Sequence, residues 1–226
     1  VQTLVSLRLA KPQRQRVATM LRRFGRSAAL GDRQRTLAYY GISDGLLVPD
    51  EGEFGYLLGQ LSAGRAFTQR SNAAKALAVA RLTESQLGRL AKQLGSLGAA
   101  EATALLPAFG GGRDATLGQV LLTVLGQASW LRGLDDAVLQ KATEGFGKTV
   151  QGQAMDLLAK ARAAPVDQTK RLRKLADRLP GGDALRGKAV FRGPKAGCSI
   201  CHSMAYHGGQ FGPDLTRIGQ VRKKMD

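Results

Sequence analysis

Apolar residues recur at intervals of three and four along most of the chain, which is the pattern of amphipathic α-helices. The pattern is regular at Leu87, Leu90, Ala91 and Leu94, and in the strongly apolar segment from Leu117 to Leu125. Strand-like alternation of apolar and polar positions is too short anywhere to predict a sheet. The pattern therefore predicts an all-α fold, with about ten helices of roughly 10 to 16 residues.

Helix ends are marked by capping and breaking residues. Pro12 fits the first turn of a helix, and Thr83-Glu84-Ser85-Gln86 matches a capping box. Asp135 can cap a later helix. The run Gly110-Gly111-Gly112 lacks the companion residues of a phosphate-binding loop, so it predicts a turn. These signals divide the pattern into helices joined by short connections.

Short connections between helices of similar length favour antiparallel pairs stacked in a row, as in a HEAT-like α-solenoid. The pairs do not align on one fixed period, so an irregular helical bundle is the alternative. Pro180-Gly181-Gly182 interrupts the helical pattern most strongly. We therefore expect a helical-repeat domain over residues 1–180 and a smaller domain over residues 181–226.

The charge balance describes possible partners without identifying one. The 226 residues include 34 Lys and Arg against 17 Asp and Glu, which gives a formal net charge of +17. Such an excess can attract polyanions, an anionic membrane surface or an acidic protein. The basic residues are scattered along the helices, so a solvated Arg-rich surface explains them equally well. The sequence predicts no transmembrane segment, because its apolar runs are too short.

Candidate chemistry is concentrated in Gly197-Cys198-Ser199-Ile200-Cys201-His202. This stretch holds both cysteines of the chain and one of its two histidines. A covalently attached haem needs two thiols for its vinyl groups and an imidazole for its iron, and the Cys-x-x-Cys-His pattern supplies all three. We therefore predict covalent haem c at Cys198, Cys201 and His202, with His202 as the proximal axial ligand of the iron.

Other uses of the two cysteines have less support from the sequence. A thioredoxin-like dithiol pair needs a βαβ context that the helical pattern lacks. A zinc site needs a second pair of ligands well separated from the first, and only His207 lies near. Zinc would therefore need ligands from elsewhere in the chain.

The residues around the motif resemble the first half of a class I cytochrome c. The resemblance rests on Gly187 and Phe191 before the motif and on Gly212-Pro213-Asp214-Leu215 after it. It implies that the carbonyl of Pro213 accepts a hydrogen bond from the proximal histidine, which fixes the imidazole and raises its basicity. It also implies that Leu215 packs on the haem.

The wider pattern resembles the HEAT-repeat and cytochrome c segment of the large haem-containing, membrane-bound dehydrogenase proteins of planctomycetes and verrucomicrobia. The similar stretches are Leu105–Asp114, Gly182–Phe191 and Gly212–Gly219. A β-propeller usually precedes this segment in those proteins, and nothing like it is present here. The resemblance implies the electron-accepting part of a larger dehydrogenase, in the periplasm or otherwise outside the cytoplasm. No motif places catalytic residues, so the chain by itself is not expected to be the enzyme.

The chain departs from the cytochrome pattern at its end. In class I cytochromes the sixth iron ligand, usually Met, comes from a later loop, and this chain stops before that loop. Met204 and His207 are too near His202 to reach the opposite face of a haem, and Met225 lacks the usual loop context. No sixth ligand is identifiable, so we expect a truncated haem domain and, from the start at Val1 without an export signal, a piece of a longer protein.

The sequence is compatible with two functions. The first is an extracytoplasmic electron-transfer module whose helical repeats dock a redox partner protein or a fused dehydrogenase domain. The alternative is a basic helical-repeat protein that binds nucleic acid or an acidic protein, with Cys198, Cys201 and His202 in a small metal site. Dispersed Arg with few aromatic residues can hold phosphates but reads little sequence, so nucleic acid is the less expected partner.

Overall fold

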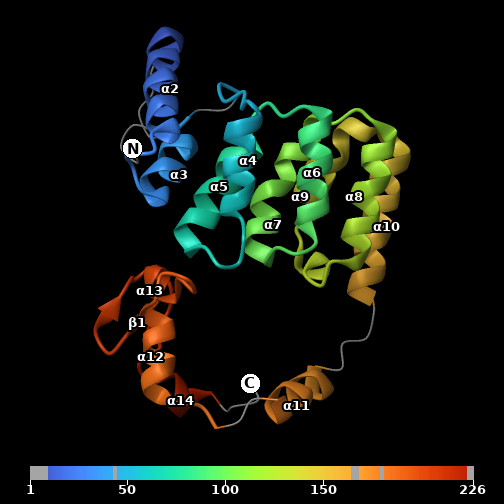
Figure 1. Ribbon diagram of the computed structural model, residues 1–226. Coiled ribbons are helices and arrows are strands. Elements are labelled where there is room, and N and C mark those ends of the chain that lie inside the picture. Colours follow the sequence, from blue (N-terminus) through green and yellow to red (C-terminus); the bar gives the residue numbers. More distant parts are fainter. Residues whose placement is uncertain (1–9, 43–44, 164–167, 179–180, 223–226) are drawn as a thin grey trace. The chain divides into compact units, whose positions relative to one another are not determined.

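The computed structural model describes residues 10–42, 45–163, 168–178 and 181–222 (Figure 1). Helices make up most of these residues, and two short strands form the one sheet in the described ranges. The prediction of an all-α fold is confirmed. Within the described ranges, no helix is both long enough and apolar enough to cross a membrane.

The chain forms two compact units, Val1–Ala164 and Pro165–Asp226. The boundary expected from the sequence lies later, at Pro180, which is outside the described residues. Helix α11 (Gln168–Arg178) lies between the two positions and is grouped with the second unit. None of its described side chains is buried. Because α11 adds no buried side chain to a core, the apolar pattern does not reveal which unit it joins.

The first unit consists of α-helices joined by short connections, three of which are 3₁₀ turns. The α-helices are α2 (Lys11–Arg26), α3 (Asp32–Tyr40), α4 (Glu51–Gln60), α5 (Phe67–Val79), α6 (Glu84–Leu94), α7 (Ala99–Leu105), α8 (Ala115–Gln127), α9 (Asp136–Thr143) and α10 (Gly147–Ala163). The 3₁₀ turns are η1 (Leu106–Gly111), η2 (Leu131–Gly133) and η3 (Glu144–Phe146).

These helices pack in two rows (Figure 1). In one row α3 packs on α5, α5 packs on α7, and η1 packs on α9. In the other row α6 packs on α8, and Arg89 of α6 forms an ion pair with Glu51 of α4. Helix α2 packs on α3, and α10 packs on both α8 and α9. Helix α10 therefore contacts both rows.

Helix ends follow the signals in the sequence. Pro12 lies in the first turn of α2. Thr83 and Gln86 form the expected capping box at the start of α6, and Asp135 caps α9. Gly110–Gly112 lies at the end of η1, where the chain turns toward α8. These four predictions are confirmed.

Two buried Glu residues connect neighbouring helices in the same way. Glu53 of α4 pairs with Arg22 of α2, and Glu101 of α7 pairs with Arg70 of α5. Both pairs join residues 31 positions apart. A carboxylate is buried at low cost only when it is paired and hydrogen-bonded. Each pair therefore joins two helices that are not consecutive in the sequence, which the apolar pattern alone does not show.

The second unit has little apolar core of its own. Besides α11 it contains α12 (Ala184–Arg192), α13 (Cys198–Cys201), β1 (Ser203–Met204), β2 (His207–Gly208) and α14 (Ile218–Val221). Phe191 is its one buried hydrophobic side chain among the described residues, whereas Leu185 is 80% exposed and Phe211 is 93% exposed.

Candidate functional site

Cys198 and Cys201 occupy the two ends of the one-turn helix α13. Gly197 precedes the helix in the left-handed region, with φ of 71°, which glycine adopts without strain. Residues three apart in a helix lie on the same face, so both thiols are presented on one side of the turn. Both cysteines are free and exposed. His202 follows as the C-cap of α13.

The His202 ring is held by the carbonyl of Pro213. Its Nδ1 lies 2.8 Å from the Pro213 oxygen. A carbonyl only accepts hydrogen bonds, so Nδ1 must carry the proton, and Nε2 of the neutral ring then has a free lone pair. The hydrogen bond expected between these two residues is therefore present, and it selects the tautomer that can bind a metal through Nε2.

Glycine allows the chain to pass directly beside this ring. A Cβ atom at Gly212 would lie 2.6 Å from Cε1 and 2.7 Å from Nδ1 of His202, closer than any side chain can approach. The backbone N–H of Gly212 donates to the carbonyl of Cys201, and that of Leu215 donates to the carbonyl of Ser203. Residues 212–215 are thus attached to the motif by backbone hydrogen bonds, and Leu215 is half-buried.

A turn of Asp214 and Thr216 holds the far end of this segment. The Asp214 carboxylate accepts a hydrogen bond from the backbone N–H of Thr216, whose hydroxyl accepts one from the N–H of Ala205. Hydrogen bonds from Thr216, and a further one from the Ser203 side chain, lower the pKa of Asp214. Sequence reasoning missed these contacts, although Asp two residues before Thr is a known turn signal.

Strands β1 and β2 form a hairpin that the sequence did not predict. Its two turn residues, Ala205 and Tyr206, have φ of 50° and 64°, in the left-handed region. Such turns usually contain Asn-Gly, and a left-handed residue with a side chain costs about 1–2 kcal/mol. Neither Ala nor Tyr signals such a turn. The Tyr206 side chain is fully exposed.

A largely apolar hollow of about 600 Å³ lies beside the motif. Its walls are one face of α12, which includes Gly187, Val190 and Phe191, together with Cys198 and the hairpin residue Met204. Its volume is within the usual range of cofactor pockets. Cys198 therefore lies beside an apolar space of the size that a cofactor requires.

Most of the residues predicted to contact haem are not part of the lining of this hollow. Cys201, His202, Pro213 and Leu215 are outside its described lining, and His207 is exposed in β2. Met225, the remaining candidate for a sixth ligand, lies outside the described residues. The roles of all these residues toward haem therefore stay predictions.

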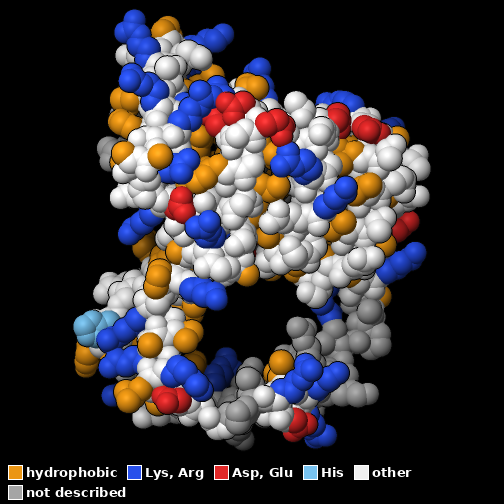
Figure 2. Space-filling view, in the orientation of Figure 1, with side chains coloured by type: hydrophobic (Ala, Val, Ile, Leu, Met, Phe, Trp, Pro, Cys, Tyr) orange, Lys and Arg blue, Asp and Glu red, His pale blue; other side chains and the backbone are white. Residues whose placement is uncertain are grey.

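Figure 2 shows how charged side chains are distributed on one face. Lys and Arg side chains are spread over both units, and several Asp and Glu side chains lie along the edge of the first unit where α4, α6 and α8 begin. Asp50, Glu51, Glu84 and Asp114 belong to these helix starts. Negative charge at a helix N-terminus is favourable, so these acids have a structural reason for their position.

The residues of α13 and its C-cap that could bind a metal are Cys198, Cys201 and His202. In the part of the chain that the structure describes, no group of three or more His, Cys, Asp or Glu residues is arranged to hold a metal ion. No known family model, curated protein or solved structure matches this chain. Its function is therefore argued from its own residues.

Proposed function

We propose that this chain is an electron-transfer module that carries a c-type haem on Cys198, Cys201 and His202. The hydrogen bond from Nδ1 of His202 to the Pro213 carbonyl carries this proposal. It leaves Nε2 as the metal-binding atom and orients the ring, as is usual for metal-binding histidines. The two free thiols in the same turn are the further support for this assignment.

Each residue of the site has a defined task under this proposal. Cys198 and Cys201 hold the haem through thioether bonds, and Nε2 of His202 binds its iron. Val190 and Phe191 of the hollow exclude water from the group. Bound haem supplies reversible one-electron chemistry, and the protein sets its ligation and access.

In this proposal the first unit is a HEAT-like α-solenoid that binds the redox partner. Support comes from the two rows of helices and from the N-caps Asp50, Thr83 and Asp114, which recur at intervals of about 30 residues. The partner is a redox protein or a fused dehydrogenase domain. Because c-type haem is attached outside the cytoplasm, the proposed location is the periplasm or another extracytoplasmic space.

Expression together with a cytochrome c maturation system tests the proposal. The purified chain should give a pyridine haemochrome spectrum of covalent haem, and the double variant Cys198→Ser/Cys201→Ser should give none. A folded wild-type chain without covalent haem contradicts the proposal. If that haem-free chain also bound DNA in a salt-dependent manner, the alternative of a basic binding protein would be favoured.

A further inference from the structure

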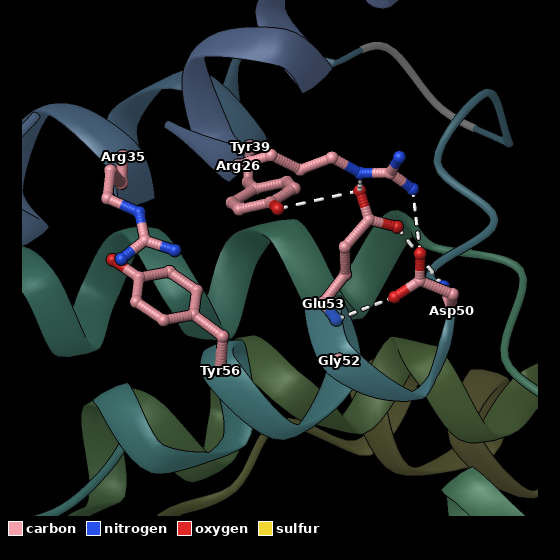
Figure 3. Close-up of a pocket in the computed structure, with 7 residues that line it drawn as sticks. All are labelled: Arg26, Arg35, Tyr39, Asp50, Gly52, Glu53 and Tyr56. Atoms are coloured by element: carbon pink, nitrogen blue, oxygen red, sulfur yellow. Dashed lines mark hydrogen bonds and ion pairs between the residues drawn. The ribbon is translucent and has the colours of Figure 1, made fainter. Parts of the chain in front are cut away.

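A second candidate site lies in the first unit, apart from the cysteine motif. Figure 3 shows a pocket of about 350 Å³ formed by α2, α3 and the start of α4. Two arginines, two tyrosines and the first turn of α4 line it. We propose that this pocket binds a carboxylate group, and that Arg35 is the residue that pairs with it.

The acidic residues of the pocket already have partners. Oε1 of Glu53 accepts hydrogen bonds of 2.7 Å from Nε of Arg22 and from Nε of Arg26, and Oε2 accepts from Arg22 and from the backbone of Asp50. Asp50 accepts from the Glu53 N–H and from Nη2 of Arg26. Burial raises the pKa of Glu53, but the two arginines outweigh it and lower that pKa to about 2. Both acids are thus paired with arginine side chains within the fold.

Arg35 differs because its ion pair with Asp32 is long, whereas its ring and backbone contacts are close. Its guanidinium lies 3.8 Å from the centre of the Tyr56 ring, and its Nε donates to the Gly25 carbonyl at 2.8 Å. The nearest carboxylate, Asp32, is 3.9 Å from Nη1. The oxygens of Asp32 are engaged by the Tyr56 hydroxyl at 3.1 Å and by Arg65 at 2.9 Å.

The Nη donors of Arg35 are therefore available. Within the described ranges, no acceptor lies at hydrogen-bonding distance from them. The side chain is only 20% exposed, so its orientation is fixed before any ligand arrives. A guanidinium is planar, and its donors have the fork geometry that matches a planar carboxylate. Pre-positioning lowers the entropy that binding costs.

The charges and rings of the pocket narrow the ligand class. Arg22 and Arg26 balance the charges of Asp50 and Glu53. Arg65 balances Asp32, which leaves the charge of Arg35 for a ligand. Burial raises the pKa of Tyr39 to about 12, so its hydroxyl stays neutral. A single negative charge can therefore pair with Arg35, whereas a dianion such as a phosphate monoester would also meet two carboxylates. The Tyr39 and Tyr56 rings favour a ligand with an apolar body.

Titration of the whole chain with benzoate and with its neutral analogue benzamide tests the proposal by calorimetry. We expect benzoate to bind about tenfold more tightly than benzamide, and Arg35→Gln to weaken benzoate about tenfold. Arg35→Lys keeps the charge but loses the fork, so it should be intermediate. Arg33→Gln, at an exposed position of the same helix, is the matched control and should bind as the wild type does.

Two further measurements keep the result interpretable. Circular dichroism shows whether Arg35→Gln is still folded. If it is not, nitrogen-15 NMR of the wild type decides: benzoate should shift the Nε–H signal of Arg35 and the amide of Gly52. Shifts confined to other regions, equal binding of benzamide, or unchanged binding by folded Arg35→Gln would overturn the proposal.

The carboxylate can come from a small acid or from an acidic side chain of a protein. A blocked peptide with one Glu, compared with its Gln version, separates these sources. Tighter binding of the Glu peptide than of benzoate identifies a protein segment, and equal or weaker binding identifies a small acid. This site is independent of haem, so the test is valid whether or not the chain carries the cofactor.

Discussion

The two units of this chain cover their apolar side chains to very different degrees. In the first unit Tyr39, Phe54 and Phe109 are at most 1% exposed, within a continuous core of Leu and Ala. In the second unit Tyr206 is fully exposed and Phe211 is 93% exposed. Burial of apolar area contributes about 25 cal/mol per Å². The first unit is therefore stabilised by its own core, whereas the second gains little from its apolar residues.

The second unit relies instead on backbone contacts around one ring. Gly212 approaches His202 closely, and hydrogen bonds attach residues 212–215 to the motif. Such contacts define local geometry but bury little apolar area. The comparison shows that the described part of the second unit is held by local contacts around His202 more than by an apolar core.

The largest effect is expected from truncating matched phenylalanines. Phe54→Ala removes a fully buried ring and should lower the free energy of unfolding by about 3–5 kcal/mol. Phe211→Ala removes an exposed ring and should change it by less than about 0.5 kcal/mol in the chain without haem. Urea unfolding followed by far-ultraviolet circular dichroism gives both values. Similar decreases in the free energy of unfolding for the two variants would refute the claim that only the first unit is stabilised by a buried apolar core.

Acid should destabilise the first unit through Glu53. Its pKa in the folded chain is about 2, below the reference value of 4.5. A lowered folded pKa stabilises the fold above the reference value, and this stabilisation is lost as pH falls from about 4.5 toward 2. The loss is about 3 kcal/mol at most. Urea midpoints measured at several pH values give the slope.

Glu53→Gln serves as the control for this pH dependence. The variant should be less stable at neutral pH and should lose most of the slope between these pH values. Glu144→Gln, at an exposed position, should keep the wild-type slope. A wild-type slope in Glu53→Gln would mean that another group is responsible.

The smallest effect is expected at Gly212. An added Cβ would displace the His202 ring and weaken its hydrogen bond to Pro213, at a cost of about 1 kcal/mol. Nitrogen-15 NMR of the haem-free chain should show a single Nδ1–H tautomer in the wild type and a mixture in Gly212→Ala. Gly219→Ala, which has open space around it, should match the wild type. An unchanged tautomer in Gly212→Ala would show that the His202 hydrogen bond does not depend on this glycine.

Much of the fold could be predicted because its signals are local. Leu87, Leu90 and Leu94 recur at helical spacing and are buried, and the capping box at Thr83 begins α6 as expected. Local pattern therefore predicted the helices and several of their starts.

What the sequence did not reveal depends on contacts between distant residues. Glu53 and Arg35 look like ordinary surface charges. Only the packing of α2, α3 and α4 shows that Glu53 is buried and that Arg35 is held over the Tyr56 ring. The turn at Ala205 and Tyr206 uses a conformation that neither residue favours. The contact of His202 with Pro213 was predicted from the resemblance to cytochromes, not from spacing.

The most direct test of the haem proposal is the mass of one peptide. Trypsin cleaves after Lys195 and Arg217, which releases a peptide that holds Cys198, Cys201 and His202. After expression with the maturation system, this peptide should carry the mass of one haem and absorb as a haem peptide. Two free thiols in the same peptide, from a folded chain, would contradict the account.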